Sequence, residues 1–116
     1  MQINFEVLDK VDFYDKEFYP SSKDDHDEGV ISYAKQYSNG RELVITLLPY
    51  GIDSIVTAEI IEGDSVLVSV TQDNVASIAF QGWGDEKILR VYLANSNNEF
   101  LIYHEPQPRV FYGELS

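Results

Sequence analysis

Short runs of β-branched and aromatic residues alternate with turn residues at spacings of about ten positions, a pattern typical of antiparallel sandwiches and barrels. Residues 3–7 alternate apolar and polar side chains, which predicts a half-buried first strand. Segments 30–37 and 43–48 flank Asn39-Gly40, a dipeptide that favours a type I′ hairpin turn because both central residues of that turn have positive φ. The run 43–48 is apolar on both faces and is therefore expected at the centre of a sheet.

A second hairpin is predicted around Gly63, between segments 54–61 and 65–71. Residues 52–62 also fit helical spacing, with Asp53 as a possible cap and the glycine as a stop. The density of β-branched residues there favours a strand over the helix.

The rest of the chain is predicted to be a meander of hairpin-connected strands. Trp83 lies between two glycines and is expected within a turn that spans residues 81–85. Because proline cannot donate to a sheet ladder, Pro106 and Pro108 are expected to break the pairing before a last edge strand. The predicted strands of this half are residues 76–80, 89–93, 100–104 and 109–115.

These patterns together predict one all-β domain over residues 1–116, mainly antiparallel, with seven to nine strands and at most one or two short helices. The strands could form a sandwich or a barrel. Residues 9–28 do not fit the strand pattern. They are acidic and aromatic and are expected to form a loop, or a short helix that ends before Pro20 with Val11, Tyr14 and Phe18 on one face and a mobile polar loop after it.

The charge of the chain limits what it can bind. Twenty acidic residues against eight basic ones give a formal net charge of −12. Such a charge repels nucleic acid phosphates and anionic membranes and attracts cationic surfaces, although acidity also serves solubility alone. The few basic residues are scattered, which argues against a groove for single-stranded nucleic acid.

Composition excludes several classes of site. With no cysteine, the chain has no disulfide, no thiolate zinc site and no cysteine nucleophile. The first residues show no basic and apolar leader pattern, and no apolar run approaches the roughly 20 residues that span a bilayer. We therefore expect a soluble cytoplasmic protein.

No catalytic pattern is evident. The two histidines, His26 and His104, lie in different segments, and nothing singles out a nucleophile or a pair of carboxylates near either of them. The acidic run 24–28 has oxygen ligands that suit a hard cation, but it lacks the spacing and central glycine of an EF-hand loop. A solvated loop or a docking site for a cationic partner fits this run better, so we expect a binding protein without a cofactor or metal.

A small, acidic, cysteine-free, β-rich chain of this kind resembles the immunity proteins that bacteria encode beside polymorphic or contact-dependent toxins. The resemblance is one of overall type and carries over no residue. It implies a cytoplasmic inhibitor that binds a cationic toxin domain, for example a nuclease, and covers its active site. Two alternatives are an acidic, nucleic-acid-mimicking inhibitor of a DNA- or RNA-binding protein and a β-barrel that binds a small ligand.

The partner-binding surface is predicted on the acidic, turn-rich side of the protein. A charged loop beside exposed aromatic residues combines electrostatic steering with a desolvated contact. The predicted contact residues are Asp24, Asp25, Asp27, Glu28, Asp85 and Glu86, with Trp83 or Tyr19 as an apolar anchor.

Overall fold

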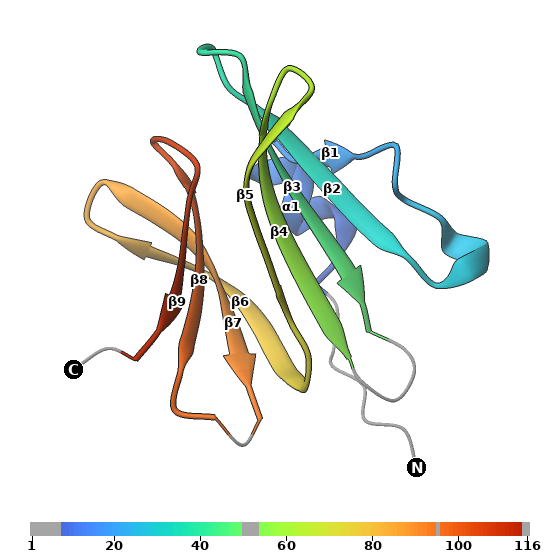
Figure 1. Cartoon of the computed structure of the whole chain (residues 1–116), viewed down its shortest axis with the longest axis vertical. Coiled ribbons are helices and arrows are strands. Elements are labelled where there is room, and N and C mark those ends of the chain that lie inside the picture. The colour runs from blue at the N-terminus through green and yellow to red at the C-terminus, as the bar shows by residue number, and fades with distance from the viewer. Residues whose placement is uncertain (1–7, 50–53, 95, 115–116) are drawn as a thin grey trace.

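In the computed structural model, which describes residues 8–49, 54–94 and 96–114, nine strands form two antiparallel sheets (Figure 1). The five-stranded sheet has the order β1 (Tyr19–Pro20), β2 (Ile31–Gln36), β3 (Arg41–Leu48), β4 (Ile55–Glu62) and β5 (Ser65–Gln72). The four-stranded sheet has the order β6 (Val75–Trp83), β7 (Glu86–Leu93), β8 (Glu99–Glu105) and β9 (Arg109–Gly113). The helices are α1 (Lys10–Asp15) and the single 3₁₀ turn η1 (His26–Glu28). The predicted all-β antiparallel class is confirmed, and the strand predicted at residues 3–7 lies outside the described residues.

The two sheets enclose one hydrophobic core. Alternate side chains of β3 and β4, such as Ile45 and Val56, face alternate side chains of β7 and β8, such as Leu89 and Ile102, and all four are fully buried. Because the described strands divide into two sheets of this kind, the arrangement is a sandwich and not the closed barrel that the sequence also allowed. Helix α1 adds Phe13, whose ring stacks on Tyr33 of one sheet at 4.0 Å and meets Phe80 of the other edge-on.

Both predicted hairpins form, with a difference at the first turn. Residues 37–40 separate β2 from β3, and three of them, 38–40, form the turn inside the pair of Tyr37 and Arg41, because the Tyr37 N–H bonds to the Arg41 carbonyl and the Gly40 N–H bonds to the Tyr37 carbonyl. Only Gly40 has positive φ, at +89°, so the turn is a type I turn closed by a left-handed glycine and not type I′. The β4–β5 turn has two residues and places Gly63 at φ +60°.

The uncertain segment 52–62 is a strand where it is described, since β4 pairs along its length with β3 and β5. This pairing makes β3 central, as predicted. The turn expected at residues 81–85 is shorter than predicted. Strand β6 continues through Trp83, which pairs with Glu86, and only Gly84 and Asp85 form the turn.

One detail of the remaining predictions was wrong. The expected helical face of Val11, Tyr14 and Phe18 does not form, because α1 ends at Asp15 and leaves Val11 62% exposed. Pro106 and Pro108 interrupt the ladder as predicted, since they lie in the loop that joins β8 to β9 in a hairpin. β9 is an edge strand, as expected.

Candidate functional site

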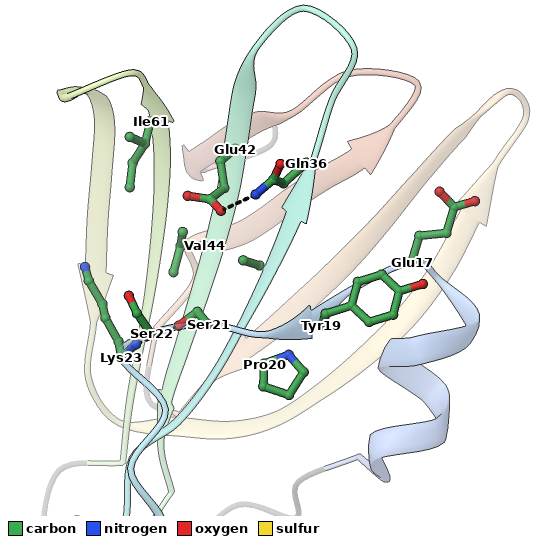
Figure 2. Close-up of a pocket in the computed structure, with 11 residues that line it drawn as sticks. Glu17, Tyr19, Pro20, Ser21, Ser22, Lys23, Gln36, Glu42, Val44 and Ile61 are labelled. Atoms are coloured by element: carbon green, nitrogen blue, oxygen red, sulfur yellow. Dashed lines mark hydrogen bonds between the residues drawn. The ribbon is translucent and has the colours of Figure 1, made fainter.

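A groove of about 600 Å³ lies on the outer face of the five-stranded sheet, away from the core (Figure 2). Its floor is formed by side chains of β2, β3 and β4, among them Ala34, Val44 and Ile61. Its wall is the segment 19–23, which leaves edge strand β1 and crosses over the sheet, so that Lys23 reaches Glu59 on β4. A groove of this volume is in the range that proteins use for ligands and peptide segments.

The polar groups of the groove come from its two ends. Glu42 accepts a hydrogen bond from Gln36 at 3.2 Å, and this pair lies beside the β2–β3 turn (Figure 2). At the α1 end, Glu17 joins the lining. Its φ of 67° lies in the left-handed region, which costs a non-glycine residue about 1–2 kcal/mol. This conformation ends α1, because the Glu17 and Phe18 N–H groups donate to the Tyr14 and Phe13 carbonyls.

Two tyrosines form an exposed aromatic pair beside this groove. Tyr14 of α1 and Tyr19 of β1 are 39% and 59% exposed, and their rings stack with centroids 6.0 Å apart. Tyr19 also lines the groove. The pair presents apolar area with its hydroxyl groups toward water, as aromatic residues do at protein interfaces.

The acidic run 24–28 is an ordered turn that continues from the groove wall. Asp24 accepts a hydrogen bond from the Ser32 N–H of β2 at 2.9 Å, and it lies 3.0 Å from His26. The Asp25 carboxylate caps η1 by accepting from the Asp27 and Glu28 N–H groups. Two of the four carboxylates therefore hold the turn, while those of Asp27 and Glu28 are exposed.

The predicted contact residues fall into two separate patches. Asp24, Asp25, Asp27 and Glu28 lie with Tyr19 on the five-stranded sheet, whereas the β6–β7 hairpin belongs to the other sheet, and the two turns are at opposite sides of the molecule (Figure 1). In the second patch Trp83 is 42% exposed, Asp85 is exposed in the turn, and Glu86 is paired with Arg109 at 2.8 Å.

The segment 9–28, which borders the groove, carries a surplus of acidic residues. Five of the eight basic side chains form ion pairs with glutamates within the described residues. Residues 9–28 hold eight acidic and three basic residues, a net charge of −5, and Lys23 there is already paired. The surface formed by this segment is therefore strongly negative.

A second polar cluster lies buried between the sheets. Lys35 of β2 is 3% exposed, and its ammonium group donates to Glu105 at 2.6 Å and to the Lys16 carbonyl at 2.9 Å. It is also 3.5 Å from Nδ1 of His104, which is fully buried between the rings of Phe18 and Phe80. A buried charge of this kind is tolerated because it is paired and hydrogen-bonded.

The surroundings of this cluster shift its protonation equilibria. Burial, and then the positive charge of Lys35, lower the pKa of His104 from 6.5 to about 4, so the imidazole is neutral at pH 7. The hydrogen bond from Lys35 lowers the pKa of Glu105. Among the described residues, the Nε2 atom of His104 is buried and has no hydrogen-bond partner.

No sequence pattern points directly to the groove lining or to the buried cluster. Alternation along β2 places Ala34 and Gln36 on one face and Tyr33 and Lys35 on the other, which could have identified Lys35 as an inward-facing cation. Which segment covers the outer face could not be read from such alternation.

No family model, curated protein or solved structure matches this chain. Over residues 8–49, 54–94 and 96–114, no three His, Cys, Asp or Glu side chains are grouped so that they could share a metal ion. In the same part of the chain no helix is long and apolar enough to span a membrane.

Proposed function

We propose that this protein is a non-catalytic inhibitor of the immunity type, which binds a basic toxin domain and covers its active site. The observation that carries the proposal is the groove on the five-stranded sheet, bordered by the exposed pair Tyr14 and Tyr19 and by the acidic segment 9–28. This surface joins the two properties that fast and specific binding needs, a field that attracts cations and an apolar area to desolvate.

Charge supports a basic partner. The net charge of −12 steers cationic surfaces toward the protein, and its effect shrinks as the Debye length falls from about 10 Å at 0.1 M salt to about 3 Å at 1 M. A nuclease is one such partner, since its substrate cleft is basic.

The experiment uses the product of the neighbouring gene as the candidate toxin. Coexpression in a host cell should restore growth when the parent chain is present, and the purified pair should bind with an association rate that falls as salt is raised. Absence of both protection and binding would reject the immunity role, and a rate indifferent to salt would reject the electrostatic argument.

A substitution at the aromatic anchor locates the interface. Tyr19→Ala should weaken binding by about 2 kcal/mol or more, roughly 30-fold, as expected for an interfacial hot spot. Tyr112→Ala, which removes a 39% exposed tyrosine from β9 of the other sheet, is the matched control and should bind like the parent. If Trp83→Ala weakens binding and Tyr19→Ala does not, the interface is the β6–β7 patch.

The charges of the acidic turn are tested without disturbing its backbone. The Asp27 and Glu28 side chains make no hydrogen bond or ion pair within the part of the chain that the structure describes, so Asp27→Asn with Glu28→Gln should slow association and leave the fold intact. The control neutralises two exposed acids elsewhere, Asp64→Asn with Asp73→Asn, and should change the rate less. Equal slowing by both double variants would mean that total charge matters and this turn does not.

A substitution at Glu17 is expected to weaken binding of the partner without lowering the free energy of unfolding. Glu17→Gly removes a groove carboxylate but suits the left-handed backbone, so the free energy of unfolding should not fall. Binding of the basic partner should nevertheless weaken. A variant that loses stability and keeps full binding would contradict a functional role for this strained residue.

A further inference from the structure

We propose that the outer face of the five-stranded sheet binds a basic amphipathic helix. This inference rests on the proposed function, since the helix would belong to the cationic partner, and it names the structural element that the groove receives. The binding surface is an apolar strip that crosses four strands and consists of Ala34, Val44, Ile61 and Val66. Val44 is only 4% exposed and forms the bottom of the groove, whereas Ala34 and Ile61 are partly exposed.

The strip follows from the strand register. Ala34 of β2 pairs with Val44 of β3, and Ile61 of β4 pairs with Val66 of β5. Val44 and Ile61 are diagonal neighbours on the same face, because Val44 pairs with Glu59 and Ile61 pairs with Glu42. Val66 is 56% exposed, so the strip is open at the β5 edge.

The same register places a carboxylate on each side of the strip. Glu42 lies on the side of the β2–β3 turn, and Glu59 lies on the opposite side. The apolar diagonal from Val44 to Ile61 therefore crosses an acidic diagonal from Glu42 to Glu59. A ligand that matches both has an apolar stripe with basic residues on its flanks, which describes an amphipathic basic helix.

Lys23 shows how such a basic side chain lies on this face. It comes from the overlying groove wall, and its ammonium group binds Glu59, whose side chain is only 14% exposed. Among the described residues, the Glu42 carboxylate accepts a hydrogen bond from the neutral side-chain amide of Gln36 and forms no ion pair. Glu42 is therefore the carboxylate available to a lysine or arginine of the bound helix.

The backbone argues for a helix over an extended segment. The face of a sheet offers mainly side chains, because the backbone groups of β3 and β4 pair with the neighbouring strands, with one register shift at Ile60/Ile61 in the β4–β5 ladder. A segment that lies there must satisfy its own backbone hydrogen bonds, and a helix does so. The four strands that the strip crosses, spaced about 4.8 Å apart, extend over roughly 14 Å, the length of a helix of about 10 residues.

The hollow on this face is also elongated. The main groove shares Gln36, Glu42 and Ile61 with a smaller neighbouring hollow of about 160 Å³ that reaches Gly40 and Gly63 at the hairpin turns. The two hollows adjoin at these three residues, and the smaller one extends from the strip toward the β2–β3 and β4–β5 turns. This shape suits a rod-like ligand better than a compact one.

The test uses synthetic peptides as probes. A 14-residue amphipathic helix of leucine and lysine, a scrambled peptide of the same composition, and a leucine–glutamate helix are titrated against the full chain at 0.1 M salt. Anisotropy of a labelled peptide gives the affinity, peptide circular dichroism gives helicity, and backbone amide shifts give the location. Only the leucine–lysine helix should bind, gain helicity and shift amides of β2 to β5.

Two substitutions test the strip, and a third serves as their control. Val66→Ser should weaken peptide binding about 5-fold and Glu42→Lys more than 10-fold. Val11→Ser removes a valine of similar exposure, 62%, from α1, and it should change affinity less than 2-fold. These variants alter exposed or half-exposed side chains, and unchanged circular dichroism of the protein confirms that each is folded.

The outcomes separate this inference from the proposed function. Equal binding of the scrambled peptide, or amide shifts confined to the acidic turn 24–28, would overturn the helix site even if the toxin partner still depends on Tyr19. Specific binding of the helix to the strip without protection against any neighbouring gene product would keep the site and reject the immunity role.

Discussion

Replacing His104 with leucine should remove a pH dependence of stability that the buried histidine creates between pH 7 and pH 4. In the folded protein the imidazole lies among Phe18, Phe80 and the Lys35 ammonium group, and its pKa is lowered from 6.5 to about 4. Glu105 opposes this shift, and the more distant charges of Lys16 and Lys87 add to it.

The sign of the effect follows from proton binding. As pH falls below 6.5 the unfolded chain binds a proton at this histidine before the folded chain does, so acid favours unfolding. The stabilisation is complete above pH 6.5, is lost progressively down to about pH 4, and changes no further below that. The difference between the two pKa values corresponds to about 3 kcal/mol, at 1.36 kcal/mol for each pH unit.

The assay is urea unfolding of the parent and His104→Leu, followed by circular dichroism at several pH values from 4 to 7.5. The quantity of interest is the difference in free energy of unfolding between the two proteins. It should shift in favour of the parent by about 3 kcal/mol from pH 4 to pH 7. Glu105, whose lowered pKa also makes acid destabilising, is present in both proteins and largely cancels.

Two further variants make the result decisive. His104→Gln removes the titration but keeps a polar side chain, in case leucine is not tolerated beside Lys35. His26→Gln alters the surface histidine, whose side chain is 61% exposed, and is the control for loss of a histidine outside the buried cluster. A parent-minus-variant difference that stays constant across this pH range for both substitutions at 104 would refute the reasoning.

Two other predictions concern the fold that carries the groove. Gly40→Ala should lower the free energy of unfolding by about 1 kcal/mol because φ is +89°, whereas Gly82→Ala, with equally open space and no positive φ, should not lower it, as denaturant midpoints will report. Phe13→Ala should cost about 3–5 kcal/mol because the ring is fully buried against Tyr33, while Tyr14→Ala, one residue away and 39% exposed, should cost less than about 1 kcal/mol in the same assay. Equal losses within either pair would contradict the reasoning.

The local features of the fold were predictable because they depend on a few neighbouring residues. The hairpins at Gly40 and Gly63, the central position of β3 and the strand at β4 all follow from turn chemistry and alternation. The exact ends of the strands and turns did not follow from these local signals. Whether the turn before Gly40 has two residues or three, and whether Trp83 belongs to a turn or to β6, is decided by the register with the partner strand.

The candidate site was predicted in part. The sequence indicated that Tyr19 and the acidic run 24–28 belong to one segment, and their neighbours in the groove come from strands that alternation identified. It could not indicate that this segment crosses the sheet to Glu59, or that the β6–β7 patch lies on the opposite side of the molecule.

By itself the sequence determined the fold class, the hairpins and the acidity of residues 9–28, because these depend on composition and on contacts between residues close in the chain. Only the tertiary structure decided that two sheets form a sandwich, that Val44 and Ile61 adjoin on its outer face, and that Lys35 meets His104, 69 positions further along the chain, inside it. The physical reason is that alternation assigns a side chain to one face of a strand, whereas its neighbours on that face are set by strand register and sheet packing.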